Sequence, residues 1–325
     1  MNRHINLLFG VGFLQLLLIA LFWMGESEST QETTKLLAID VDEATVLKVS
    51  DGQHSVEIVK HAQGWQVAGA PADAEKVLET LEKLAKLEIS WPVASTTESH
   101  ERFEVEADNF QRKVEVLGAA GTQAVLFMGT SPGYQRVHAR SLKGTDVHAV
   151  ALSNYEFSTD VDPWVAKNTF QMSEVPQRVS VEHIGGRTDT LSKSDDGWLF
   201  NNLAAKPDAA ETYMNRFTNL RVLGLAEKDR DTEAVAKLIV EDGAGASQSL
   251  LISRQVTDQN TEGEAASSEY FLQAVQSQAA ESSIQYRLAT YLAEQLLMSD
   301  TDLVLDVEVD KDNNGENSIS AEPDN

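Results

Sequence analysis

The most metal-like string in the chain lies at its C-terminal end, in residues 310–325 (DKDNNGENSISAEPDN). Asp310, Asp312 and Asn314, followed by a glycine, match the opening of an EF-hand loop, which carries oxygen ligands at its first, third and fifth positions. The twelfth position, where a bidentate acid completes such a site, is Ala321. The string therefore predicts a disordered acidic tail, and we expect no bound metal and no cofactor.

A pair of carboxylates is the second candidate for chemistry. Asp160 and Asp162 stand two residues apart in TDVDPW, and a glycosidase requires an acid and a base that flank a sugar bond. Nothing else in the sequence indicates a sugar cleft, and an aspartate before Pro163 is typical of a turn or a helix start. The structural interpretation is favoured, and an anchored hydrolase is the weakest functional hypothesis.

Neither the histidines nor the serines form a catalytic motif. The chain has seven histidines, none of them in a metal-binding spacing such as H-E-x-x-H. His138 and His148 fall in predicted strands and could face each other across a sheet, although such pairs are more often structural. G-x-S-x-G, phosphate-loop and dinucleotide motifs are absent from the sequence. The sequence predicts no catalytic and no cofactor-binding residue, and we do not expect an enzyme.

The segment GTSPGYQRVHAR (residues 129–140) is the most distinctive local string. Arg136, His138 and Arg140 alternate along it and therefore share one face of a predicted strand. In an acidic chain such a basic stripe could dock an anionic partner, which makes these three residues the candidate partner-docking site. Pairing with the protein's own carboxylates is the alternative.

Composition limits the classes of partner. The 325 residues include 26 Lys and Arg against 51 Asp and Glu, a formal net charge of −25. A surface this acidic repels nucleic acid and anionic lipid headgroups. The hydrophobic content of 42% is that of a folded chain, and the absence of cysteine excludes disulfides and thiol chemistry.

The N-terminal region predicts a membrane anchor. Residues 5–24 (INLLFGVGFLQLLLIALFWM) carry no charge, and a helix of this length spans a hydrocarbon core of about 30 Å. Arg3 and His4 precede the stretch and acidic residues follow it, so the positive-inside rule places the N-terminus in the cytoplasm. We expect a single-pass anchor in residues 1–25 and a polar tether in 26–34. A cleaved signal peptide is the alternative, although its apolar run is ordinarily shorter.

The rest of the chain repeats one pattern. Alternating apolar and polar residues predict a three-stranded meander that ends at Trp65, and a second that ends at Trp198. Each meander precedes a helical pattern and a hairpin, and matching residues follow at a constant spacing of 136. The sequence predicts an α+β fold, with the N-terminal transmembrane helix followed by two tandem repeats of antiparallel β-meander, helix and further hairpin strands. The repeats are expected over 35–172 and 173–309.

The helical patterns predict which side chains are buried. The expected apolar faces are Val77, Leu81, Leu84 and Leu87 in the first helix, and Tyr213, Phe217, Leu220 and Leu223 in the second. A longer helix is expected around QYRLATYLAEQLLM (residues 285–298), near the end of the second repeat.

The apolar N-terminal stretch, the Gly-Trp strand ends, the regular leucines and the run from HERFEVEADNF through VEVLGAAGTQAVLFMGTSPGYQRVHAR to DPWVAK form a recognisable combination. It resembles the domain-of-unknown-function 4340 family of bacterial envelope proteins, over about residues 35–170 and more weakly beyond. The resemblance implies a periplasmic, membrane-tethered α+β protein without established catalysis. Such proteins often accompany ABC-type transport systems of the gliding-motility-associated kind.

We therefore expect a non-enzymatic accessory or scaffold subunit of an ABC-type transporter complex in the bacterial inner membrane. The bulk of the chain would lie in the periplasm, and its partner would be a transporter permease or auxiliary protein. The alternative is a periplasmic ligand-binding or sensing module for a glycan or a cation.

Overall fold

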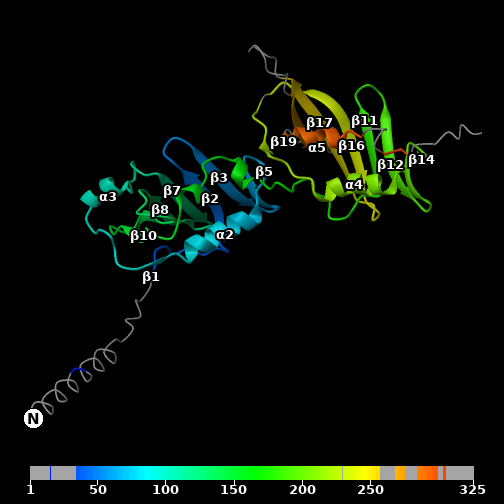
Figure 1. Ribbon diagram of the computed structural model, residues 1–325. Helices are drawn as coiled ribbons and strands as arrows, with labels where there is room; N and C mark the ends of the chain where they lie inside the picture. Colours follow the sequence, from blue (N-terminus) through cyan, green and yellow to red (C-terminus); the bar gives the residue numbers. More distant parts are fainter. Residues whose placement is uncertain are drawn as a thin grey trace, which may run out of the picture. The chain divides into compact units, whose positions relative to one another are not determined.

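The computed structural model describes Gln15 and residues 34–228, 230–256, 268–275, 284–298 and 303–304 (Figure 1). The predicted anchor, apart from Gln15, most of the predicted tether and the predicted tail lie outside the described residues. The chain separates into two compact units, residues 1–55 with 78–159 and residues 56–77 with 160–325.

Antiparallel β-sheet is the main regular structure of the described chain. The strands of one sheet are β2 (Ala44–Ser50), β3 (Ser55–His61), β4 (Gly64–Val67), β5 (Ala70–Pro71), β7 (Arg112–Gly118), β8 (Gly121–Met128), β9 (Val137–Ser141) and β10 (His148–Val150), in the order β10-β9-β8-β7-β2-β3-β4-β5. Two short strands, β1 (Thr34–Lys35) and β6 (Glu88–Ile89), pair separately.

The other large sheet has nine strands among the described residues. They are β11 (Arg178–His183), β12 (Thr188–Ser194), β13 (Gly197–Phe200), β14 (Leu203–Ala204), β15 (Gly224–Leu225), β16 (Glu233–Glu241), β17 (Ser247–Val256), β18 (Ser268–Ala274) and β19 (Tyr286–Leu288). Their order is β14-β13-β12-β11-β16-β17-β18-β19-β15. Its longest pairing joins β16 and β17, where apolar and polar residues alternate with the period of two that a sheet requires.

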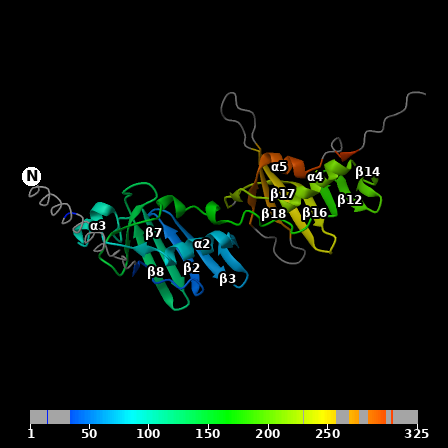
Figure 2. The same cartoon turned by 60° about the horizontal axis from the view of Figure 1, so that its bottom comes forward.

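Among the described residues, helices are few and short. They are α2 (Ala74–Ala85), α3 (Glu98–Phe103), α4 (Pro207–Thr218) and α5 (Thr290–Leu296), with 3₁₀ turns η1 (Asn154–Glu156) and η2 (Asp162–Trp164). Figures 1 and 2 both show α2 beside β2. Val77, Leu81 and Leu84 of α2 are completely buried, as their helical spacing predicted. Helix α4 touches α5 and β13, and α5 touches β18.

The predicted fold class is wrong. The regular structure of the described chain is mostly β-sheet with few helices, and none of its described helices has the length and apolarity needed to cross a bilayer. In both large sheets, strands that follow one another along the chain take up the same spatial order. The tandem repeats predicted from the constant spacing are not shown. The segments that alternate with a period of two form paired strands here. These strands contain more of the described residues than the helices do.

Two local expectations also change. Helix α4 ends at Thr218, so Leu223 lies beyond it and is exposed instead of lying on its buried face. The long helix expected over residues 285–298 is divided, because Tyr286 pairs with Leu225 and Leu272 in the sheet before α5 begins. Sheet pairing with distant strands overrides the local helical spacing.

The turn between β2 and β3 is held by Asp51. Its carboxylate accepts hydrogen bonds from the backbone N–H groups of His54 (2.7 Å) and Gln53 (2.9 Å), and from the Thr159 hydroxyl (3.1 Å). These bonds, led by the one from His54, stabilise the charged form and lower the pKa of Asp51 from 3.8 to about 2.

The variant Asp51→Asn is expected to reduce the acid sensitivity of the fold. Because the folded pKa lies below the ordinary value, the carboxylate contributes stability that is fully present above pH 3.8 and is lost as the pH falls through about 2. Urea midpoints between about pH 5 and about pH 2 should therefore fall more steeply for the wild type than for Asp51→Asn. Asp195→Asn, at an exposed carboxylate, should behave as the wild type does. Equal slopes for wild type and Asp51→Asn would contradict this expectation.

Candidate functional site

Strand β9 carries two of the three predicted docking residues, and Arg140 is buried there. Its Nε donates to the carbonyl oxygen of Val105 at 2.9 Å, and its Nη1 to those of Ser141 and Gly144 at 3.3 and 3.2 Å. The guanidinium lies 4.8 Å from the ring centroid of Phe127. Burial lowers the pKa of Arg140, because the charged form loses hydration. The three carbonyl oxygens therefore hold the Arg140 guanidinium where it has little access to solvent.

His138 is also buried. Its Nδ1 lies 2.9 Å from the Thr130 hydroxyl, and its ring centroid lies 4.3 Å from that of Phe103. Burial lowers the pKa of His138, which favours the neutral imidazole. Arg136 precedes β9, is exposed, and donates from Nη2 to the carbonyl oxygen of Ala149 at 2.6 Å. The docking role of these residues stays a prediction.

The register of β9 and β10 separates the two histidines. His138 pairs with Ala149 and His148 pairs with Ala139, so the two rings point to opposite faces of the sheet. The expectation that they face each other is therefore wrong. Within the described ranges, no group of three or more acidic, histidine or cysteine side chains is placed to hold a metal ion.

Two tyrosines of the first unit are almost entirely exposed, Tyr134 by 89% and Tyr155 by 95%. Tyr134 lies in the loop before β9, and Tyr155 lies in η1. The two segments are joined where Asn154 Nδ2 donates to the carbonyl oxygen of Gly129 at 3.0 Å. Arg136 is exposed on the same loop as Tyr134. We call Tyr134, Arg136 and Tyr155 the aromatic corner.

Local backbone contacts fix the loop that carries Tyr134. The Ser131 hydroxyl contacts the carbonyl oxygens of Gly133 at 2.8 Å and Arg136 at 2.7 Å. At the base of the loop, a Cβ on Gly129 would lie 1.9 Å from the carbonyl oxygen of Phe103, so only glycine fits there. The string GTSPGYQRVHAR does not reveal that its tyrosine is exposed, and this exposure required the structure.

Of the two aspartates of TDVDPW, Asp162 makes contacts that hold the fold together. Asp162 forms an ion pair with Arg287 and accepts a hydrogen bond from the backbone N–H of Leu225 at 2.9 Å. The approach is so close that a Cβ on Gly224 would lie 2.1 Å from the Asp162 carboxylate. Asp160 lies two residues earlier in the same segment. The contacts of Asp162 attach this segment to β15 and β19 of the second unit.

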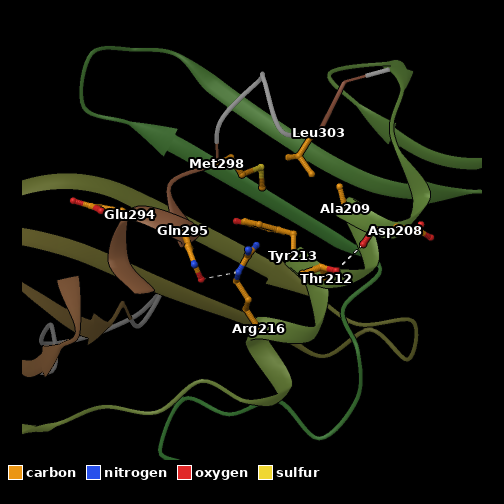
Figure 3. Close-up of a pocket in the computed structure, with 9 residues that line it drawn as sticks. All are labelled: Asp208, Ala209, Thr212, Tyr213, Arg216, Glu294, Gln295, Met298 and Leu303. Atoms are coloured by element: carbon orange, nitrogen blue, oxygen red, sulfur yellow. Dashed lines mark hydrogen bonds between the residues drawn. The ribbon is translucent and has the colours of Figure 1, made fainter. Parts of the chain in front are cut away.

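A pocket of about 340 Å³ opens between α4 and α5 in the second unit (Figure 3). It is lined by Asp208, Ala209, Thr212, Tyr213, Arg216, Glu294, Gln295, Met298 and Leu303. The residues from α4 share one side of the helix because they recur at intervals of three and four. The other wall begins about 80 residues further along the chain, and no local pattern in the sequence indicated that the two would meet.

Arg216 lines this pocket, and two neighbouring side chains hold it in place. Arg216 Nε donates to Gln295 Oε1 at 3.1 Å, and its guanidinium lies 5.4 Å from the ring centroid of Tyr213. Tyr213 is buried and donates its hydroxyl to the carbonyl oxygen of Leu296 at 2.8 Å. Burial raises the pKa of Tyr213, so the phenol stays protonated. Among the described residues, none accepts a hydrogen bond from either Nη atom of Arg216.

Comparison with known proteins identifies the family. The model of the family described as "Domain of unknown function (DUF4340)" matches residues 65–238, more than half of the 325 residues. The chain therefore belongs to this family, as the sequence motifs indicated. No curated protein and no solved structure matches the chain.

Proposed function

We propose that the protein is a non-enzymatic periplasmic accessory or scaffold subunit of an inner-membrane ABC-type transporter complex. The observation that supports this proposal is the exposure of the aromatic corner, whose two tyrosines and one arginine lie on two segments that a hydrogen bond connects. The apolar stretch of residues 5–24 supports a location at the membrane. The partner is the permease or an auxiliary protein of the transporter.

The composition of the aromatic corner suits a protein partner. Tyrosine and arginine are enriched in protein interfaces and at the residues that dominate binding energy. A tyrosine ring offers a large, stiff surface with a polar end, so it loses little conformational entropy when it is covered. Arg136 adds a positive charge to a strongly acidic chain and therefore favours an acidic patch on the partner.

Truncation of both tyrosines is expected to release the partner. Crosslinking of the full-length protein in intact membranes, followed by mild-detergent pull-down and mass spectrometry, should recover a permease and its ATPase. If each tyrosine contributes about 2 kcal/mol, the double variant Tyr134→Ala, Tyr155→Ala should reduce their yield at least tenfold.

Tyr291→Ala provides the matched control, because Tyr291 is exposed on α5 in the other unit. Its yield should equal that of the wild type. Equal yields for all three proteins would reject the aromatic corner as the docking surface. Recovery of the protein alone would reject the transporter role and favour the alternative of a periplasmic ligand-binding or sensing module.

A further inference from the structure

We propose that the pocket between α4 and α5 binds a small monocarboxylate with an apolar tail. This inference goes beyond the proposed docking function, because it concerns a small molecule and a different surface. It depends on three features of the pocket: an oriented arginine, an apolar wall and acidic residues at its ends.

Arg216 is oriented to receive the carboxylate. Its Nε is held by Gln295 and its guanidinium lies against Tyr213, which fixes the plane of the fork. Both Nη atoms lack an acceptor in the described chain, and a guanidinium presents paired N–H groups that match a carboxylate. Figure 3 shows the side chains of Arg216 and Gln295 directed toward each other.

The tail of the ligand would lie on the apolar wall. Met298 and Leu303 are buried, and Ala209 and the ring of Tyr213 complete the apolar lining. In Figure 3 Met298, Leu303 and Ala209 surround one side of the Tyr213 ring. The volume of about 340 Å³ lies near the lower end of the range for small-molecule sites, about 300–1,000 Å³.

The ends of the pocket carry negative charge. Asp208 and Glu294 are exposed, and in Figure 3 their side chains extend outward on opposite sides of the pocket. A second carboxylate at the far end of a ligand would approach one of these acids and be repelled. The pocket should therefore prefer a monocarboxylate to a dicarboxylate of the same length.

Calorimetric titration of the full-length protein tests the proposal with defined probes. Butyrate, hexanoate and octanoate measure the contribution of the tail, while octanamide removes the charge and suberate adds a second one. At least one monocarboxylate should bind. If octanoate binds, octanamide and suberate should each bind at least tenfold more weakly, because a hydrogen-bonded charge pair contributes about 1.5–3 kcal/mol.

Two variants assign the binding to this pocket. Arg216→Gln should weaken octanoate at least tenfold and leave octanamide unchanged, whereas Ala209→Phe should weaken both by filling the space. Arg178→Gln, at an exposed arginine on β11, is the matched control and should bind octanoate as the wild type does. Urea midpoints of each variant establish that it is folded.

Several outcomes would overturn the proposal. The proposal would be wrong if no monocarboxylate bound, or if octanoate and octanamide bound with equal affinity. It would also be wrong if folded Arg216→Gln bound octanoate as tightly as the wild type does. The probe comparison needs no variant, so a failure of Ala209→Phe to fold would leave the test intact.

Discussion

Replacement of Asp189 by alanine is expected to lower the free energy of unfolding by about 1–3 kcal/mol. Asp189 is only 1% exposed, and its carboxylate lies 2.9 Å from His183 Nε2 and 2.8 Å from Arg187 Nη2. It also accepts a hydrogen bond from Asn201 Nδ2 at 3.1 Å. Removing the carboxylate deprives three polar groups of their shared acceptor and leaves space in the sheet face.

A second variant separates charge from volume at this position, and a third serves as the control. Asp189→Asn keeps the size of the side chain and one oxygen, so its cost should be smaller than that of Asp189→Ala. Asp195→Ala, at an exposed residue of the following turn, should stay within about 0.5 kcal/mol of the wild type. Urea denaturation followed by circular dichroism measures all three. A loss below about 1 kcal/mol for Asp189→Ala would show that the network contributes little.

The variant Trp164→Ala is expected to cost about 3–5 kcal/mol through the cavity that it creates. Trp164 is 0% exposed and is among the largest fully buried side chains described. Its ring lies 4.6 Å below the Lys76 ammonium, and its carbonyl oxygen accepts from the backbone N–H of Asp73 at 2.8 Å. The ring therefore joins the segment that follows Asp162 to the start of α2.

An exposed tryptophan supplies the control for this cavity. Trp91 is 81% exposed, so Trp91→Ala should change the free energy of unfolding by no more than about 0.5 kcal/mol. Trp164→Phe should cost less than Trp164→Ala, because more of the ring volume is retained. If Trp164→Ala unfolded at the same urea midpoint as Trp91→Ala, the packing role of Trp164 would be refuted.

Trp164 and Asp189 illustrate two different limits of prediction from the sequence. TDVDPW was singled out for its aspartates, yet its tryptophan is the buried member and Asp162 pairs with Arg287, which is 125 residues away. Asp189 belongs to none of the motifs found in the sequence. It is the second residue of β12, whereas the second residue of β3, in the corresponding place of the other large sheet, is the buried Val56. An aspartate at a strand position that is apolar in the corresponding strand was a usable sign of a buried polar residue.

The sequence alone determined the features that depend on neighbouring residues. The alternating runs located the strands that contain Trp65 and Trp198, although these strands continue to Val67 and Phe200. The leucine spacing located α2 and its buried face. The motifs also identified the family correctly.

Only the tertiary structure decided which side chains are covered and which distant groups meet. His138 and Arg140 alternate along one strand, but an alternation does not reveal that this face is covered, and both are buried. The pocket joins Arg216 to Gln295 across 79 residues. Burial and long-range contacts depend on sheet register and on which elements pack over each face, and these are set by the whole chain instead of by local spacing.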